Sequence, residues 1–272
     1  MTTNKDFFEL CAQGALTEVN TAIENGADVN GKDKEDITAL MRATENMNPD
    51  VAKLLLDKGA DPNARSNNGW VTALLVAAQL NSNPEITSLL IGRGADMEAR
   101  NGDCATALMV AATTENTEVV KLLLERGADV ETRDESGMTV LMRTAEYNFN
   151  PEVITLLLKH GTDPNAKDEY KQTALMWATK NTNPDIVPIL LDAGADMNIQ
   201  DKDGQTPLMW AVQNQDSNPN VIKTLLDCGA DPSIKDNNGK IALDYAQKNS
   251  NLKGTTALTQ LEKATRSQSI ER

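Results

Sequence analysis

The only histidine is the first residue to weigh as a catalytic group. His160 lies in Leu158-Lys159-His160-Gly161, a pattern typical of a helix end. A catalytic base needs a nucleophile or an orienting acid held beside it, and the neighbouring sequence indicates neither. A cation near a helix C-terminus is favourable in itself because it meets the negative end of the helix dipole. We therefore predict a structural role for His160, no catalytic residue and no enzymatic activity.

The cysteines offer little further chemistry. Cys11, Cys104 and Cys228 are odd in number and widely separated, and the chain has no CxxC pair. This usage favours reduced thiols in a cytosolic protein over a disulfide framework or a zinc site. A phosphate-cradling GxxxxGK loop is also absent. The sequence indicates no metal and no cofactor.

Composition narrows the function classes. Hydrophobic residues make up 40% of the 272 residues but aromatic residues only 3%, which favours thin helical layers over one large core. The formal charge of −14 opposes binding to a phosphate backbone. The sequence contains no apolar run of about 18 residues, and we expect neither a signal peptide nor a membrane span. We expect a cytoplasmic monomer that binds neither nucleic acid nor a membrane.

Two motifs recur in step along the chain. Gly-Ala-Asp, once Gly-Thr-Asp, returns at intervals of 33, 35, 33, 34, 33 and 35 residues. A second landmark of the type Thr-Ala-Leu-Met keeps the same phase, beginning at residues 38, 72, 106, 139, 173 and 206, with a degenerate copy from Ile241. A period in this range indicates a stack of similar supersecondary units.

These motifs together resemble the ankyrin-repeat family over nearly the whole chain. The resemblance implies an all-α solenoid of about eight helix pairs joined by β-turn fingers. It also implies that a protein partner binds the finger tips and the concave surface of the first helices. One departure is clear: the family usually has His after the Leu of its Thr-Pro-Leu-His motif, whereas this chain has mostly Met.

Each part of the repeat has a physical role. Gly of Gly-Ala-Asp ends the second helix of a pair in a left-handed conformation. Turn residues such as those of 61–69 then form a finger, and the Thr of the landmark caps the next first helix. The second helix opens with Asn as N-cap, usually followed by Pro. These caps are expected at Asn48, Asn83, Asn116, Asn150, Asn183 and Asn218.

Two sets of recurring residues could suggest chemistry but have simpler interpretations. The Met place holds Met41, Leu75, Met109, Met142, Met176, Met209 and Asp244. One Met per layer facing one interior is better explained as core filling than as a copper site. The Asp of each Gly-Ala-Asp, from Asp28 to Asp231, stands where it can bond turn amides.

The ends of the array differ from its middle. We predict one domain over residues 1–265, with an N-terminal capping pair at about 5–25 and internal repeats over about 26–239. A polar capping pair at about 240–264 follows, because a stack needs ends that face water. A frayed tail is expected over residues 266–272.

Candidate contact residues are those that vary between repeats. In a chain poor in aromatics, all three Trp and all three Tyr residues fall at candidate surface positions, and such side chains dominate binding hot spots. Trp177 and Trp210 could instead pack on the adjacent layer. The candidate partner-binding residues are Trp70, Tyr170, Trp177, Trp210, Tyr245, Arg42, Arg143, Tyr147 and Met138.

A basic row also recurs in the fingers, at Lys32, Arg65, Arg100, Arg133, Lys167 and Lys235, with Gln200 interrupting it. Such a row could receive an acidic or phosphorylated partner. Each of these six basic residues is followed by Asp or another polar residue, so we favour a solvated, partly self-neutralised row.

The sequence therefore favours a non-enzymatic protein-protein interaction module, an adaptor or scaffold, with an aromatic-bearing concave surface. An alternative is an acidic inhibitor or immunity-type protein that blocks a basic partner such as a nuclease toxin, which the charge of −14 would favour. The partner's identity stays open.

Overall fold

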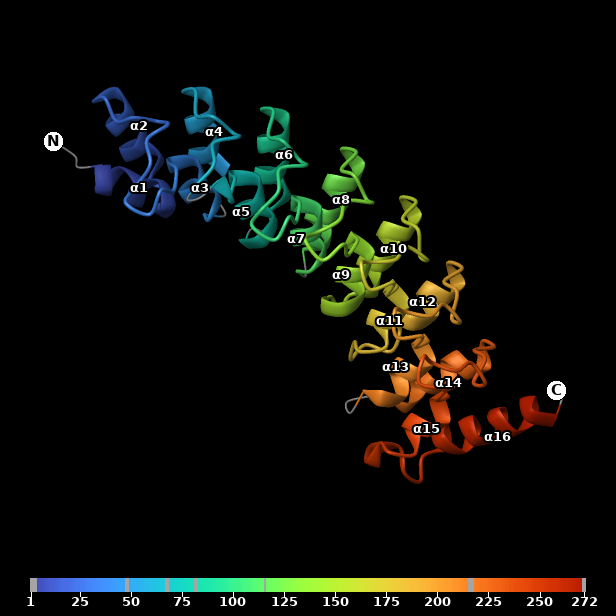
Figure 1. The fold of residues 1–272 in the computed structure, drawn as a ribbon. Coiled ribbons are helices and arrows are strands. Elements are labelled where there is room, and N and C mark those ends of the chain that lie inside the picture. Colours follow the sequence, from blue (N-terminus) through green and yellow to red (C-terminus); the bar gives the residue numbers. More distant parts are fainter. Residues whose placement is uncertain are drawn as a thin grey trace. The chain divides into compact units, whose positions relative to one another are not determined.

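A computed structural model describes residues 4–46, 49–66, 69–80, 83–114, 116–214 and 218–270. Within these residues the chain forms sixteen α-helices, one 3-10 turn and isolated β-bridges rather than strands (Figure 1). The all-α prediction of about eight helix pairs is confirmed. The helices divide between two compact units, Met1–Glu135 and Ser136–Arg272.

The first unit contains four helix pairs. Their bounds are α1 Asn4–Gln13, α2 Leu16–Glu24, α3 Ala39–Thr44, α4 Pro49–Asp57, α5 Ala73–Leu80, α6 Pro84–Gly92, α7 Ala107–Ala112 and α8 Thr117–Glu125. Each odd-numbered helix packs on the even-numbered helix that follows it and on the next odd-numbered one. The even-numbered helices stack in the same way, so the unit has two helical layers.

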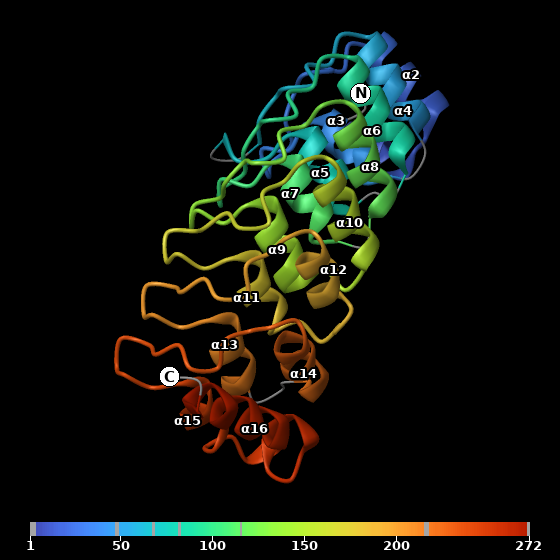
Figure 2. The ribbon, with the colours of Figure 1, turned by 90° about the vertical axis from the view of Figure 1, so that its right-hand side faces the viewer.

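The second unit repeats this arrangement. Its elements are α9 Val140–Tyr147, α10 Pro151–Lys159, α11 Ala174–Ala178, α12 Ile186–Asp192, α13 Pro207–Gln213, α14 Pro219–Asp227, α15 Ala242–Ala246, η2 Ser250–Leu252 and α16 Thr256–Ile270. The first helices α9, α11, α13 and α15 form one layer and their partners α10, α12, α14 and α16 form the other. Figure 2 shows the fingers of the second unit projecting to one side of its helices.

Thr and Asn begin the helices largely as the sequence predicts. Thr38 accepts a hydrogen bond from the Met41 amide, and equivalent bonds form at Thr72, Thr106, Thr139 and Thr206. Thr173 forms no such bond, and its hydroxyl is buried without a partner among the described residues.

The Asn caps of the second helices are more varied. Asn83, Asn150 and Asn218 each accept the amide two residues on. Asn183 makes the same bond, although α12 begins only at Ile186. Asn116 makes no side-chain cap bond, and Asn48 lies outside the described residues.

The core is aliphatic and thin. The large residues of the second helices, such as Leu90, Leu157 and Leu225, are fully buried. The Met residues at the landmark are also buried at 0–2% exposure, which agrees with core filling and leaves no open Met row for a metal. Asp244 alone in this series is exposed, and it accepts the amide of Ile241.

In three of the fingers an asparagine joins adjacent repeats. Asn30 donates from Nδ2 to the carbonyl of Gly59 at 3.0 Å and accepts from the amide of Asp61 at 2.8 Å. Asn63 and Asn165 form the same two bonds one repeat further on. These Gly carbonyls follow helix ends in a left-handed turn, Gly59 at φ +92°, so each Asn fixes one finger to the next helix end.

The recurring Asp residues are structural, as expected. Each accepts the backbone amide two residues on, at 2.8–3.0 Å, from Asp28, Asp61, Asp96, Asp129, Asp163, Asp196 and Asp231. These bonds tighten the turn that follows every second helix.

The C-terminal end differs from the prediction in one respect. The sequence predicts a frayed tail over residues 266–272, whereas α16 continues to Ile270. Residues 271 and 272 lie outside the described part. The division into two compact units leaves the single domain over residues 1–265 as a prediction. No described helix is long and apolar enough to cross a bilayer.

Candidate functional site: an aromatic and lysine surface in the second unit

Trp177 and Trp210 meet edge to face on neighbouring first helices. Their ring centroids are 5.5 Å apart with an interplanar angle of 76°. Trp177 is on α11 and Trp210 on α13, and each follows the buried Met of its landmark. Both side chains are half-buried, so each packs on the neighbouring layer and still offers part of its surface to solvent. This edge-to-face geometry is a favourable one for aromatic pairs.

Lys180 lies against both rings. Its Nζ is 4.6 Å from the centroid of Trp177 and 4.3 Å from that of Trp210, within the range of a cation–π interaction. Lys180 follows α11 by two residues and is exposed. Lys180 is not among the contact residues predicted from the sequence. The spacing between Trp177 and Lys180 could have identified it, because a cation three residues after an aromatic lies on the same side of a helical turn.

Two further lysines repeat the arrangement in the same unit. Lys202 Nζ is 4.9 Å from the ring centroid of Tyr170, and Lys240 Nζ is 5.4 Å from that of Tyr245. Lys202 and Tyr170 occupy successive fingers, where the amide of Lys202 also donates to the carbonyl of Tyr170 at 2.9 Å. We call the set the aromatic–lysine surface; it consists of Tyr170, Trp177, Lys180, Lys202, Trp210, Lys240 and Tyr245.

Two buried finger carboxylates, Asp201 and Asp236, accept hydrogen bonds from aromatic side chains of this surface. Oδ1 of Asp201 accepts the amides of Asp203 and Gln205, and Oδ2 accepts Nε1 of Trp210 at 2.9 Å. Asp236 makes the corresponding two amide bonds, and its Oδ2 accepts the Tyr245 hydroxyl. In both pairs the aromatic residue follows the carboxylate by nine positions, so the finger orients the ring of its own repeat.

These bonds change the acidity of the groups involved. Burial would raise the pKa of Asp236, but the hydrogen bonds from Tyr245, Lys240 and Asn238 outweigh it and hold that pKa below its usual value. The bond to the Asp236 carboxylate, with burial, raises the pKa of Tyr245. The pair is therefore a carboxylate bound to a neutral phenol at neutral pH.

Trp177 lacks the bond that Trp210 has. Its Nε1 is buried and has no hydrogen-bond partner among the described residues. The finger carboxylate nine positions earlier is Asp168. It accepts the amides of Tyr170 and Gln172 at 2.8 Å, the same two amide bonds that Asp201 makes in the next repeat. A buried N–H without an acceptor lowers stability. Because the indole N–H forms no hydrogen bond, only packing and ring contacts hold the Trp177 side chain in place.

The remaining predicted contact residues of the second unit lie elsewhere or are covered. Arg143 and Tyr147 pair on α9, with the guanidinium 5.9 Å from the ring centroid, and Tyr147 is 48% exposed. Met138 was a candidate for partner contact, but only 5% of it is exposed. It precedes the capping Thr139 and packs into the core, so that prediction is wrong in so far as it needs an exposed side chain.

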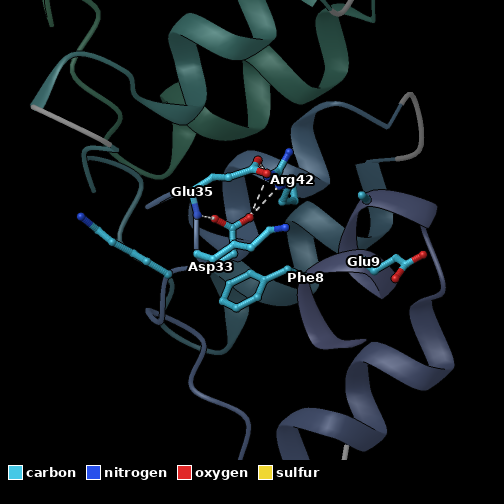
Figure 3. A pocket seen from close by; sticks show the side chains of 8 residues that line it. Phe8, Glu9, Asp33, Glu35 and Arg42 are labelled. Atoms are coloured by element: carbon cyan, nitrogen blue, oxygen red, sulfur yellow. Dashed lines mark hydrogen bonds and ion pairs between the residues drawn. The ribbon is translucent and has the colours of Figure 1, made fainter. Parts of the chain in front are cut away.

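The first unit holds Trp70 and Arg42. Trp70 is 48% exposed in its finger. Its ring lies close to Gly102 of the next finger, where a Cβ atom added to Gly102 would be 3.7 Å from the nearest ring atom. Arg42 borders an opening of about 470 Å³ between α1 and the first finger (Figure 3). Phe8, Glu9 and Ala12 of α1 line it from one side, with Lys32, Asp33, Lys34 and Glu35 opposite.

Arg42 is held by carboxylates of its own chain. Its Nε and Nη2 donate to Oδ2 of Asp33 at 3.0 and 2.7 Å, and Nη2 lies 2.6 Å from Oε2 of Glu35. Burial would raise the pKa of Asp33, but bonds from the Ile37 amide and from Arg42 lower it. Arg42 therefore stabilises the first finger, in the place that Trp210 and Tyr245 take in later repeats.

Two arginines of the basic row, and the Gln200 that interrupts it, form hydrogen bonds to backbone carbonyls of the fingers. Nη1 of Arg65 donates to the carbonyls of Gly69 and Arg100, and Nη1 of Arg100 donates to those of Cys104 and Arg133. Gln200 makes the equivalent pair of bonds to Gly204 and Lys235. At these positions the side chain joins successive fingers, which the sequence interpretation of a solvated row did not foresee.

His160 is exposed at the end of α10, where Nδ1 is 2.9 Å from the carbonyl of Leu156. No group of three His, Cys, Asp or Glu side chains with metal-binding geometry occurs in the described part of the chain. Cys11, Cys104 and Cys228 are all unpaired.

Comparison with known families agrees with this geometry. A model of ankyrin repeats in three copies matches residues 7–101, 74–168, 141–236 and 175–266, which together cover nearly the whole sequence. The chain belongs to the ankyrin-repeat family. The ankyrin repeat is a general fold for protein–protein interaction, and its members are typically not enzymes.

A solved ankyrin-repeat structure is similar to most of this chain. The crystal structure of the ankyrin repeat domain of Bcl-3, described as a unique member of the IkappaB protein family, matches with a TM-score of 0.66 and 34% identity. The match covers 75% of this chain and 92% of that domain.

Two curated proteins match over shorter stretches. Ankyrin repeat protein FPV222 of fowlpox virus (strain NVSL) is 40% identical over 65 residues, or 24% of this chain. The human mitochondrial disaggregase is 44% identical over 62 residues, or 22% of this chain. The matched region spans only 9% of each of these two proteins, so it reports the shared repeat and not their activities.

Proposed function

We propose that this ankyrin-repeat chain is a non-enzymatic adaptor or scaffold that binds a protein partner through the aromatic–lysine surface. The observation that carries the proposal is the pair Trp177 and Trp210 with Lys180 against both rings. Partly exposed Trp side chains beside a cation are the groups that contribute most to binding at protein interfaces. Because they are fixed by packing before a partner arrives, little conformational entropy is lost on binding.

The exposed aromatics of the fingers extend this surface. Tyr170 is 56% exposed and lies one finger from Lys202. Fingers and first helices also carry the residues that differ most from repeat to repeat, whereas the bonds of Asn30, Asn63 and Asn165 are alike. Residues that vary while the scaffold stays constant can determine which partner is bound.

Capture from native lysate tests the proposal. The full chain is compared with a variant carrying Tyr170→Ala, Trp177→Ala and Trp210→Ala, and captured proteins are quantified by mass spectrometry. Phe149→Ala is the matched control, because Phe149 is 54% exposed in the α9–α10 connection of the same unit and does not belong to the surface. We expect a partner retained by the wild type and the control to be lost from the triple variant. Equal retention by all three would refute the proposed surface.

An acidic inhibitor of a basic partner is the second candidate, and charge distribution favours the first unit for that role. Residues 1–135 contain 12 Lys and Arg against 23 Asp and Glu, a net −11, and residues 136–272 contain 14 against 17, a net −3. A basic partner would therefore be attracted mainly to the first unit. Its binding would weaken steeply with salt and would survive the triple aromatic substitution, which separates the two candidates.

A further inference from the structure

The charges of the aromatic–lysine surface are arranged unequally. The carboxylates beneath it are fully used: Asp201 and Asp236 each accept two backbone amides and one side-chain donor. They are also buried, at 7% and 5% exposure. Their negative charge therefore serves the finger and the ring above it and is not presented to a partner.

The lysines are in the opposite situation. The ammonium groups of Lys180, Lys202 and Lys240 lie on aromatic rings and form no ion pair with any carboxylate in the described parts of the chain. Lys180 and Lys202 are exposed and Lys240 is half-buried. By contrast, Arg42 and Arg93 in the first unit are both paired with carboxylates. Within the described residues, these three lysines thus present ammonium groups that form no ion pair.

The rings fix where these cations stand. A lysine side chain in solvent samples many rotamers, and ordering it on binding costs free energy. Contact with an aromatic face restricts the ammonium group in advance while leaving its N–H donors directed to solvent. Lys180 is the most restricted, because it touches two rings that already contact each other.

We infer that the aromatic–lysine surface binds an acidic segment of the partner protein, in which Asp or Glu side chains alternate with apolar ones. This rests on the proposed function and specifies the chemistry of the partner. The carboxylates would pair with Lys180, Lys202 and Lys240 as charge-assisted hydrogen bonds. The apolar side chains would cover the parts of Trp177 and Trp210 that remain exposed.

A single-stranded nucleic acid fits these features less well. Bases bind such proteins by stacking on free aromatic faces, but here lysines already occupy ring faces. A polyanion would also extend beyond the three lysines into the field of a chain with net charge −14. A short acidic segment places its few charges at the lysines alone.

Selection from displayed random peptides of about twelve residues, which span up to about 40 Å when extended, tests the inference on the full chain. Enriched sequences are expected to be rich in Asp and Glu with interspersed apolar residues. The best peptide is then synthesised with a fluorophore, and its affinity is measured by anisotropy. A pool that is basic, a pool without charge or the absence of an enriched pool would overturn the inference.

Charge reversal locates the binding site of that peptide. The variant Lys180→Glu/Lys202→Glu is compared with Lys159→Glu/Lys223→Glu, which makes the same change of net charge at exposed lysines on α10 and α14. We expect a loss of about tenfold or more in the first variant and little change in the second, because a charge-assisted contact contributes about one factor of ten. Equal losses would show a general field effect and overturn the assignment.

Parallel titration with an oligouridylate covers the other polyanion. Binding of that RNA that is tighter than binding of the best peptide and is lost in Lys180→Glu/Lys202→Glu would favour nucleic acid and refute the acidic segment. The lysate experiment separates this inference from the proposed function. A partner lost on removing the aromatics but indifferent to lysine reversal would sustain the surface and refute the acidic segment.

Discussion

Nε1 of Trp210 donates a hydrogen bond of 2.9 Å to Oδ2 of Asp201, nine residues earlier in the same repeat. One repeat before, the Nε1 of Trp177 is buried without a partner in the described structure. The two indoles occupy equivalent positions after a buried Met and touch each other. They differ in one hydrogen bond, so they form a natural pair for measuring what that bond contributes.

Substitution by Phe should affect the two sites differently. Trp210→Phe removes the donor and leaves Oδ2 of Asp201 without it, so we expect a loss of about 1 kcal/mol or more in the free energy of unfolding. Trp177→Phe removes an N–H that has no acceptor, so stability should stay the same or rise after the loss of ring area is taken into account. Urea unfolding followed by circular dichroism measures both. An equal loss in the two variants would contradict the assignment.

The bond between Tyr245 and Asp236 predicts a pH dependence with two limits. The pKa of Asp236 is lowered in the folded chain, so its contribution is present above the ordinary Asp pKa of about 4 and is lost as the pH falls. The pKa of Tyr245 is raised, so its contribution is present below the ordinary Tyr pKa of about 10 and is lost as the pH rises through the folded value.

Tyr245→Phe should therefore reduce stability at neutral pH and flatten both limits. Unfolding midpoints in urea, measured from about pH 3 to pH 11, show the effect as a narrower difference between neutral and extreme pH. Tyr170→Phe is the control, because Tyr170 is 56% exposed and its described ring contact is with Lys202. A profile for Tyr245→Phe that parallels the wild type would show that the pair does not govern this dependence.

The three cysteines should react at very different rates. Burial raises the pKa of Cys11 to about 12, and its side chain is 0% exposed, whereas Cys228 is exposed. Because the thiolate is the reactive form, a disulfide reagent at about pH 8 should modify Cys228 first and Cys11 only when the first helix pair opens. Cys228→Ser should remove the fast phase. Rapid modification of Cys11 in the native chain would contradict its burial.

A charge in the core should divide the unfolding transition. Leu157 on α10 is fully buried, so Leu157→Asp places a carboxylate where it has no solvent and opens the layer between its neighbours. Stacked repeats are stabilised by nearest neighbours, so flanking repeats should survive the local loss and unfold in a separate stage. Circular dichroism during urea titration should show two steps.

Leu157→Ala is the matched variant for that experiment. It should cost about 2–5 kcal/mol through lost burial and a cavity, without introducing a charge. A single unchanged transition in Leu157→Asp would be inconsistent with nearest-neighbour stacking.

Much of the repeat could be predicted because it recurs. The positions of Gly-Ala-Asp and of the Thr landmark determine where helices end and begin, and Thr38 and Thr206 cap their helices as expected. Recurrence also identified the Met place as core, which Met109 and Met142 confirm. Periodic residues have periodic causes, so sequence alone identifies them well.

What differs between repeats was harder to predict. Met138 directly precedes Thr139 and is buried, whereas Trp70 stands two residues before Thr72 and is 48% exposed, so a shift of one position separates a core residue from a finger residue. Lys180 and Lys202 were missed because their role depends on rings in a neighbouring repeat. The spacing of nine between Asp201 and Trp210 recurs in Asp236–Tyr245 and Asp33–Arg42 and was legible in the sequence.

The Asn bridges between fingers have a consequence for how such a chain can change in length. Asn30, Asn63 and Asn165 each offer one donor and one acceptor to the same two backbone groups of the following repeat. Any repeat bearing this residue can follow any other without leaving a polar group unmatched at the junction. Duplication of a repeat that bears this Asn would therefore preserve that bridge at the new junction, and the chain could gain binding surface in units of one repeat.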